Sequence, residues 1–380
     1  LRFITCGSVD DGKSTLIGRM LYESHMLFDD HLAALEADSK KVGTQEGEID
    51  FALLVDGLAA EREQGITIDV AYRFFSTDKR KYIVADTPGH EEYTRNMATG
   101  ASTADVAIIL VDASQGVLTQ TRRHSFIVSM VGVKKIVLAI NKLDLVEYSE
   151  EVYSSIVSDY TQFADEALNI DEITAIPISA LKGDNIVGIS KNTPWYTGPS
   201  VMEYLELVEV SSVSQSRQFR LPVQWVNRPN REFRGFAGLI GSGHISPGER
   251  IRVLPSGKES VVEKIVTYDG DLQIAGAGRS VTLTLEDEID ISRGDVITKA
   301  ENPCSIADQF QTRILWMDDS GMMPGREYLF KSNTQSTNMT LGKLKHRIDV
   351  NTLEKLPAKI LEMNELGVCL SLIHISEPTR

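Results

Sequence analysis

The sequence has little of three things: cysteine, long hydrophobic runs and targeting signals. Its three cysteines are scattered through 380 residues without a Cys-x-x-Cys pair, which argues against a disulfide framework and against zinc. The longest aliphatic run, Val106 to Val111, is far shorter than the ~20 residues of a membrane-spanning helix. No signal peptide opens the chain, which starts without Met in a β-like stretch. We therefore expect a cytoplasmic protein that does not bind membranes.

The sequence also lacks a basic excess, because its formal net charge is −15. Residues 1–210 hold 33 acidic and 18 basic side chains, whereas residues 211–305 hold 12 of each and residues 306–380 hold nine of each. Proteins that grip a nucleic-acid backbone usually carry a basic surface, so this distribution predicts no nucleic-acid partner.

One local run of arginines departs from that balance. It is offset only by Glu232, and it contains Arg217, Arg220, Arg228, Arg231 and Arg234. Two interpretations stay open: a solvated barrel edge, or a docking surface for an acidic partner or nucleotide.

Two styles of sequence divide the chain. Residues 1–210 alternate short aliphatic runs with longer amphipathic stretches, which is typical of an α/β domain with a doubly wound, mostly parallel sheet. After a polar, serine-rich stretch at 211–218, apolar and polar residues alternate between frequent glycines, which predicts antiparallel β-barrels. We predict three domains: 1–210, a barrel over 219–303, and a second barrel over 306–380 whose last stretch, 370–380, follows no clear pattern.

The segment from Gly7 to Ser14 fits the pattern G-x-x-x-x-G-K-S, between a predicted strand and a predicted helix. In this motif the glycines let the backbone curl so that successive N–H groups face a phosphate, and the following helix adds its positive N-terminus. Lys13 would contact β- and γ-phosphate oxygens, and the Ser14 hydroxyl would enter the shell of a Mg²⁺ ion.

Three further short motifs each follow a buried strand, where ligands bind in open α/β sheets. In Asp86-Thr87-Pro88-Gly89 the carboxylate would hold Mg²⁺ through water, and the Gly89 N–H would reach the γ-phosphate. In Asn141-Lys142-Leu143-Asp144 the Asp144 carboxylate would accept from guanine N1–H and its amino group, and in Ser179-Ala180-Leu181 the Ala180 N–H would face guanine O6. Each motif is weak alone, but together and in this order they predict a guanine nucleotide site.

Two residues are candidates for sensing and hydrolysing the γ-phosphate. Thr67, within Glu61–Ile68, would add a second hydroxyl to Mg²⁺ when the γ-phosphate is present; it could instead simply start a strand. His90 would orient the attacking water; alternatively, it caps the following helix. No arginine finger is evident in the sequence, although Arg62 is possible, so we expect slow intrinsic hydrolysis unless a partner completes the site.

These motifs resemble those of the elongation factor Tu-like translation-factor GTPases, which carry a G domain followed by two β-barrels. Elongation factors usually have His where this chain has Ser8. The chain more closely resembles the large GTPase subunits of bacterial ATP sulfurylase, the sulfate adenylyltransferase subunit 1 family. The segments that carry this closer resemblance are Cys6–Thr15, Leu54–Leu58, Asp69–Arg73, Pro194–Tyr196, Val226–Asn230 and Glu286–Asp295.

The resemblance implies a regulatory GTPase that uses GTP and Mg²⁺. Its hydrolysis would be coupled to the formation of adenosine 5′-phosphosulfate and pyrophosphate from ATP and sulfate by a catalytic small subunit, in a heterodimer or larger assembly. Lys13, Thr67, Gly89 and His90 would serve catalysis, and Ser14, Thr67 and Asp86 the metal. The predicted GTP contacts are Gly7, Ser8, Val9, Asp10, Asp11, Gly12, Lys13, Ser14, Thr15, Asp86, Thr87, Pro88, Gly89, His90, Asn141, Lys142, Asp144, Ser179, Ala180 and Leu181.

The alternative function is that of an elongation factor carrying aminoacyl-tRNA. Such a carrier should show basic stripes on its barrels, whereas both later segments are neutral. Some relatives also carry a kinase for the phosphosulfate product. This sequence has no second phosphate loop, so any such kinase would lie outside it.

Overall fold

The computed structural model describes residues 1–24, 51, 67, 69–209, 217–230, 233–349, 352 and 354–373. These residues divide into two compact units. The first contains Leu1–Val208 with the short segments Ile348–Leu356 and Met363–Leu366, and the second contains the rest.

The first unit alternates strands and helices along the chain. In order, its elements from 1 to 208 are β1 (Arg2–Cys6), α1 (Lys13–Glu23), β2 (Ala71–Ser76), β3 (Lys81–Asp86), the 3₁₀ turn η2 (Glu91–Tyr93), α4 (Thr94–Ala101), β4 (Val106–Asp112), α5 (Thr119–Met130), β5 (Lys135–Asn141), the 3₁₀ turn η3 (Leu143–Val146), α6 (Glu150–Ala167), β6 (Glu172–Pro177) and α7 (Val201–Leu207).

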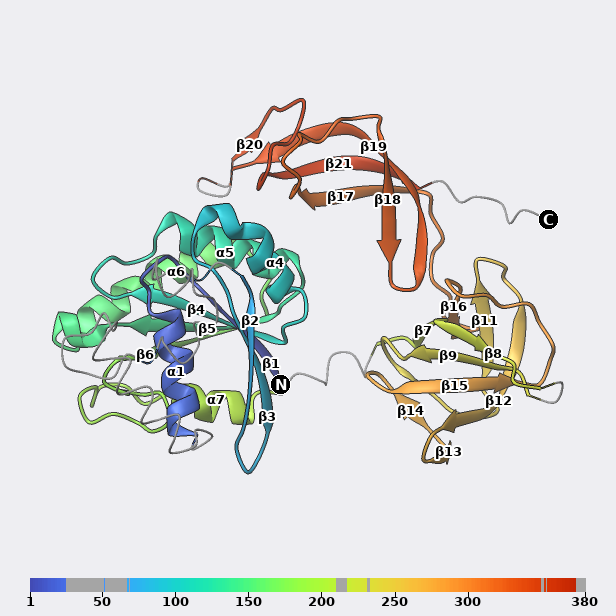
Figure 1. Ribbon diagram of the computed structural model, residues 1–380, viewed down its shortest axis with the longest axis horizontal. Helices are drawn as coiled ribbons and strands as arrows, with labels where there is room; N and C mark the ends of the chain where they lie inside the picture. Colours follow the sequence, from blue (N-terminus) through green and yellow to red (C-terminus); the bar gives the residue numbers. More distant parts are fainter. Residues whose placement is uncertain are drawn as a thin grey trace. The chain divides into compact units, whose positions relative to one another are not determined.

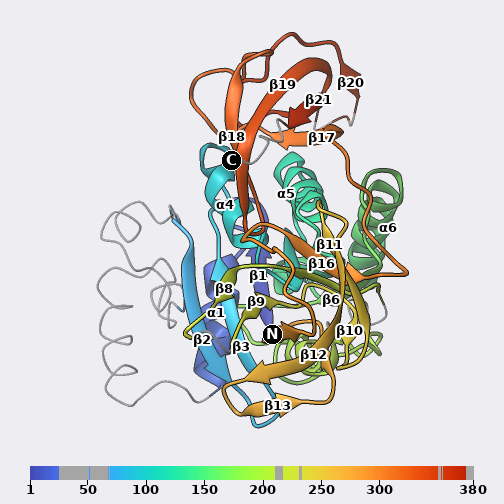
Figure 2. The same cartoon turned by 90° about the vertical axis from the view of Figure 1, so that its right-hand side faces the viewer.

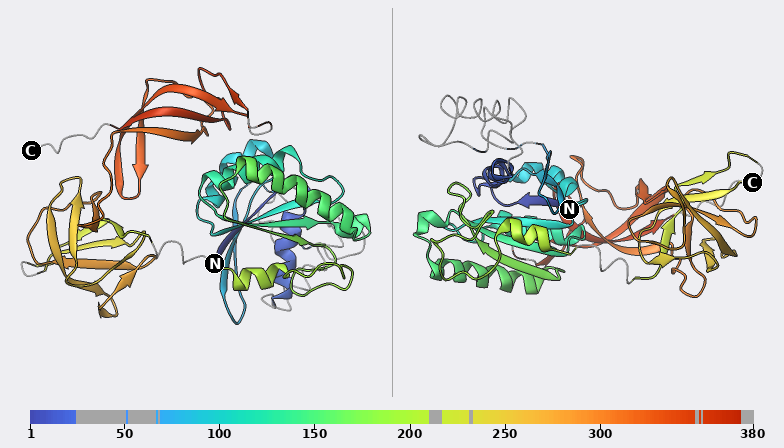
Figure 3. Two further views of the ribbon diagram at one scale, coloured as in Figure 1. Left: turned by 180° about the vertical axis from the view of Figure 1, so that it is seen from behind. Right: turned by 90° about the horizontal axis from the view of Figure 1, so that it is seen from below.

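Its six strands form one sheet in the order β2-β3-β1-β4-β5-β6. Every neighbouring pair is parallel except β2 and β3, and β2 lies at an edge (Figure 2). Helices cover both faces of the sheet (Figures 1 and 3). All seven residues of β4 are buried, which explains the aliphatic run seen in the sequence. The predicted doubly wound, mostly parallel sheet is confirmed.

The parallel strands deliver the predicted motifs to one edge of the sheet. β1 runs into Gly7, β3 ends at Asp86 and β5 ends at Asn141, which is in register with the last residue of β4. β6 ends two residues before Ser179. Because the carboxyl ends of parallel strands share an edge, all four motifs meet there.

The second unit and the end of the chain consist of strands. They are β7 (Arg220–Pro222), β8 (Trp225–Asn227), β9 (Gly235–Leu239), β10 (His244–Ile245), β11 (Arg250–Leu254), β12 (Glu259–Thr267), β13 (Gly270–Leu272), β14 (Ala275–Gly276), β15 (Ser280–Leu285), β16 (Val296–Lys299), β17 (Gln309–Leu315), β18 (Glu327–Ser332), β19 (Gln335–Ile348), β20 (Lys355–Leu356) and β21 (Leu366–Ile373).

Strands β7 to β16 enclose a core of aliphatic and aromatic side chains, including the buried Phe219 and Phe236. Their main sheet runs in the order β7-β16-β11-β12-β15-β9-β8, with β13 on β12, and its neighbouring strands pair antiparallel. The later strands form a second sheet, in the order β17-β21-β19-β18 with β20 on β19. An α/β domain followed by antiparallel β-sheets is therefore the observed fold class.

The tail differs in part from the expectation. Residues 370–373 lie in β21, between β17 and β19, and Ser371 is fully buried. In β21 Cys369 and Ser371 are buried, whereas the apolar Leu370 between them is exposed, so the sequence pattern did not reveal the strand. Residues 374–380 lie outside the described part.

The arginine run is used largely within its own unit. Arg220 donates to the carbonyls of Phe219 and Asn302, at 2.7 and 2.9 Å. Arg228 and Arg234 each approach an acidic side chain of the 286–290 segment at 3.9 Å. Arg231 and Glu232 lie outside the described residues, and the docking interpretation stays a prediction.

Candidate guanine nucleotide site

The phosphate loop, Gly7–Ser14, is held from beneath by side chains. The Gly7 N–H donates to His124 Nδ1 at 3.2 Å, and the Ser8 N–H donates to Asp11 Oδ2 at 2.5 Å. Gly12 lies in the left-handed region with φ 88°, and a Cβ there would stand 2.4 Å from Asn141 Nδ2. Glycine at this position is therefore required both by the backbone turn and by the neighbouring strand tip.

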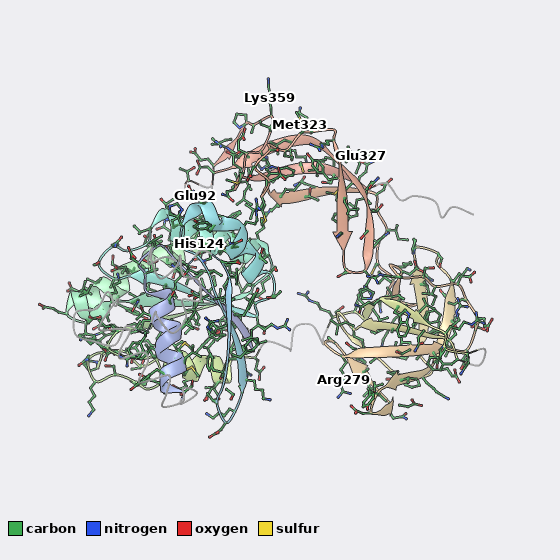
Figure 4. The ribbon with its side chains drawn as sticks, viewed as in Figure 1. Glu92, His124, Arg279, Met323, Glu327 and Lys359 are labelled. Atoms are coloured by element: carbon green, nitrogen blue, oxygen red, sulfur yellow. The ribbon has the colours of Figure 1, made fainter. Side chains whose placement is uncertain are left out.

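His124 is a supporting residue that the sequence did not reveal. It lies on α5 (Figure 4) and is fully buried. Burial, together with nearby Lys13 and Arg123, lowers the pKa of His124 to about 3, so the imidazole is neutral and can accept the Gly7 N–H. A lone histidine in an amphipathic helix carries no motif, and only the fold places it under the loop.

Lys13 is buried in the loop, and its ammonium donates to the carbonyls of Gly7 at 3.3 Å and Ser8 at 2.6 Å. Burial lowers the pKa of Lys13, while the carboxylates of Asp11 and Asp86 oppose that shift. A polyphosphate would offer this ammonium charged acceptors in place of neutral carbonyls.

Gly89 approaches the same loop closely. A Cβ on Gly89 would stand 2.6 Å from Lys13 Nζ and 2.8 Å from backbone atoms of Ser8 and Val9. Any other residue would push the chain after β3 away from the phosphate loop. The structure thus brings Gly89 and Lys13 together.

Three side chains whose oxygens could coordinate a metal ion lie near the start of α1. Ser14 Oγ donates to Asp86 Oδ2 at 2.7 Å and lies 3.4 Å from Thr67 Oγ1. Asp86 is buried, which raises its pKa, while hydrogen bonds from Ser14 and Thr5 and the charge of Lys13 oppose that rise. One carboxylate with two hydroxyls fits Mg²⁺, which prefers few protein oxygens beside water and phosphate. The described residues contain no cluster of three or more His, Cys, Asp or Glu able to hold a metal.

Asn141 joins the phosphate loop to the Ser179–Leu181 loop. Its Nδ2 donates to Asp11 O at 2.7 Å, and its Oδ1 accepts the Ala180 N–H at 2.8 Å. The Ala180 N–H expected to face guanine O6 is therefore already bonded, and a base would have to share this donor.

The loops that follow β5 and β6 have further supports. Lys142 is left-handed with φ 59°, and its ammonium pairs with Asp112 at 2.8 Å. Burial opposes ionisation of Asp112, but bonds from Lys142 and Ser114 keep its pKa below the usual value. From α1, Arg19 donates to Ala180 O at 3.2 Å and to Leu181 O. Asp144 lies half-buried in η3, which follows the end of β5.

His90 lies at the surface, where its Nδ1 accepts the Glu92 N–H at 3.3 Å. This bond is the cap that the sequence offered as the alternative to water orientation. The rest of the Glu61–Ile68 segment around Thr67, and the segment Leu54–Leu58, lie outside the described residues. No described helix is both long and apolar enough to cross a membrane.

The family described as "Elongation factor Tu GTP binding domain" matches residues 1–219, and "GTP-eEF1A C-terminal domain-like" matches residues 309–377. A protein named "Sulfate adenylyltransferase subunit 1" from Alteromonas mediterranea is 59% identical over 97% of this chain and 78% of its own length. A "Bifunctional enzyme NodQ" from Rhizobium sp. (strain N33) is 56% identical over 97% of this chain and 57% of its own length.

Among solved structures, the GTPase-like domain of S. cerevisiae Ski7, bound to GDP and inorganic phosphate, covers all of this chain and 90% of that chain. Its TM-score is 0.54 at 18% identity, a likeness that shows the fold alone. The sequence identities and the family match carry the assignment: this chain belongs to the sulfate adenylyltransferase subunit 1 family, whose first domain is an elongation factor Tu-type GTP-binding domain.

Proposed function

We propose that the chain is the GTPase subunit of a sulfate adenylyltransferase and that it binds GTP with Mg²⁺ at the carboxyl edge of its first sheet. The observation that carries the proposal is the convergence of four motifs from distant parts of the chain at this edge. Asn141 joins two of them directly, through Asp11 and Ala180.

In this proposal the residues that would bind the phosphates, Gly7–Ser14 with Gly89, are already in position. The N-terminus of α1 and the buried Lys13 ammonium supply positive charge, while Gly89 leaves room for its own N–H to approach the γ-phosphate. Ser14, Thr67 and Asp86 would hold Mg²⁺, which when bound would neutralise charge on the phosphate oxygens. Loss of the γ-phosphate would remove a contact of the Gly89 segment and free Thr67.

Base selection would fall to Asp144. Its carboxylate can accept from both N1–H and the amino group of guanine, a donor pair that adenine lacks. The Ala180 N–H would be shared between Asn141 and O6. His90 would exchange its bond with the Glu92 N–H for one to the attacking water, so hydrolysis would require a small local rearrangement.

Sulfate activation would take place on a partner. A phosphate–sulfate anhydride is strongly uphill to make, and GTP hydrolysis linked to a γ-phosphate-sensing switch can pull its formation forward. The name "subunit 1" of the relatives supports a partner subunit. We propose that this partner is the catalytic small subunit that joins ATP and sulfate.

The test is to assay the chain with its copurifying protein for sulfate-dependent release of pyrophosphate from ATP. We expect GTP to increase the yield of the phosphosulfate product, and a non-hydrolysable GTP analogue to fail to do so. If tRNA, rather than that protein, accelerates GTP turnover, the carrier function would replace this proposal.

A further inference from the structure

Hydrogen bonds of several side chains connect the segment after Asp144 to the loop that carries Ala180. These side chains are not among the proposed nucleotide contacts. We propose that Tyr148, Asp184 and Trp195 form a base latch, a set of positioning residues that fixes Asp144 relative to Ala180 and thereby sets the preference for guanine. The inference rests on the proposed function and names the residues that would control its base specificity.

The chain between Asp144 and Tyr148 is held in an uncommon conformation. Glu147 and Tyr148 are consecutive non-glycine residues with φ 54° and 55°, in the left-handed region. The turn is closed by the Tyr148 N–H, which donates to Leu143 O at 2.9 Å. Non-glycine residues keep such angles only where their surroundings hold them, so the turn that carries Asp144 depends on what fixes Tyr148.

Two side chains fix Tyr148. Its hydroxyl donates to Asp184 Oδ2 at 2.7 Å, and its carbonyl accepts the Trp195 indole N–H at 3.1 Å. Burial and the bond to Asp184 raise the pKa of Tyr148 to about 12, so the phenol remains a donor at neutral pH. The other oxygen of Asp184 accepts from Ser190 Oγ at 2.5 Å and Asn192 Nδ2 at 3.0 Å, which holds the carboxylate in place.

The same residue, Asp184, organises the second loop through its main chain. Its carbonyl accepts the Ser179 N–H at 3.3 Å, and the neighbouring Gly183 N–H donates to Ser179 O at 2.8 Å. Asp184 therefore holds the Asp144 turn with its side chain and the Ala180 loop with its backbone. Trp195 belongs to Pro194–Tyr196, a segment that the sequence singled out without assigning it a task.

The latch can be separated from general stability by comparing GTP with inosine triphosphate (ITP). ITP lacks the 2-amino group, so it loses one of the two donors that Asp144 would accept. Misplacing Asp144 should therefore weaken the binding of GTP more than the binding of ITP. A role in stability alone would weaken both nucleotides equally, because they share the ribose, phosphates and O6.

The experiment is calorimetric titration of the full chain and its Tyr148→Phe variant with GTP and with ITP, in excess Mg²⁺. We expect the variant to bind GTP about fivefold more weakly and ITP almost as before. The ratio of the affinity for GTP to the affinity for ITP, the GTP/ITP ratio, should therefore fall. Tyr153→Phe is the matched control, because Tyr153 packs on Trp195 at 5.0 Å but donates to Ala175 O at 3.0 Å, away from both loops. Its GTP/ITP ratio should match that of the unmodified chain.

Trp195→Phe tests the latch through its other bond, since phenylalanine keeps the ring but loses the N–H, and it decides the matter if Tyr148→Phe does not fold. A smaller fall of the same ratio is expected. An unchanged ratio, or an equal weakening of both nucleotides, would overturn the latch while leaving GTP binding by the unmodified chain intact. If the unmodified chain bound no GTP, the proposed function would fail and the latch with it.

Discussion

The two ends of the nucleotide site are built in different ways. The phosphate end, Gly7–Ser14 with Gly89, comes mostly from one contiguous stretch and uses backbone groups, a buried lysine and a helix N-terminus. The base end, Asn141–Tyr148 with Ser179–Asp184, is assembled from separate segments by side-chain bonds from Asn141, Arg19 and Tyr148. In the proposed site, recognition of phosphate would thus be local in the sequence, whereas recognition of the base would depend on the fold.

Asn141 is where the two ends meet. It takes one hydrogen bond from the Ala180 loop and gives one to the phosphate loop, and its amide packs where a Cβ on Gly12 would stand. A change at one end can therefore alter the other end through Asn141. Substitutions at other residues are the ones that test the two ends separately.

The largest effect should come from breaking the phosphate end at Lys13. In Lys13→Ala the loop loses its buried cation, and we expect affinity for Mg²⁺–GTP to fall roughly 1,000-fold, because charge-assisted bonds to phosphate are lost. The affinities for GDP and GTP should both fall, and the preference for guanine over other bases should not change. Calorimetry checks this, with Lys135→Ala as control, since that lysine pairs with Glu172 away from the loop. A loss below tenfold would argue against the loop as the phosphate site.

The next effect should come from the base end. Asp144→Asn replaces an acceptor with a mixed donor and acceptor, so we expect GTP affinity to fall roughly 300-fold and xanthosine triphosphate to become the better ligand. Competition binding with both nucleotides measures the switch, and the exposed Asp171→Asn serves as control. Unchanged GTP affinity in Asp144→Asn would contradict the assignment of the base pocket.

A smaller effect is expected from His90, whose Nδ1 accepts the Glu92 N–H. His90→Ala should slow GTP hydrolysis roughly 100-fold while leaving GTP affinity within about twofold, because water orientation acts on the reaction and not on binding. Single-turnover hydrolysis and calorimetry measure the two quantities separately, with the exposed His244→Ala as control. Equal losses in rate and affinity would assign His90 to the cap that it forms with Glu92.

The smallest effect concerns the support of the phosphate end. The pKa of His124 is lowered to about 3 in the folded chain, so between pH 3 and 6.5 the unfolded chain binds more protons at this site. Stability contributed by His124 is therefore complete above pH 6.5 and is lost as the pH falls. When the pH falls from 7 to 5, we expect the free energy of unfolding to decrease by about 2 kcal/mol more in the unmodified chain than in His124→Gln.

Chemical unfolding at pH 7, 6 and 5 measures this difference. His244→Gln, which removes an exposed histidine, should follow the unmodified chain. Parallel losses in the unmodified chain and His124→Gln would contradict the neutral, buried state of His124.

The contrast between the two ends also explains what could be predicted from the sequence. The doubly wound sheet, the barrel-like strands and the contiguous phosphate loop were predictable, because aliphatic runs and glycine spacing record local constraints. The supports were not: His124, Arg19 and Asp184 act only after the fold brings them to loops distant in the sequence. The end of β21, residues 370–373, was missed because the polar Ser371 is buried while the apolar Leu370 beside it is exposed.

The most direct test of the central claim is calorimetric titration of the full chain with GTP and with ATP, each with excess Mg²⁺. The account predicts saturable binding of GTP at a single site and affinity for ATP at least about 100-fold weaker, since adenine lacks the donor pair for Asp144. Equal affinity for both nucleotides, or no heat with GTP, would contradict it.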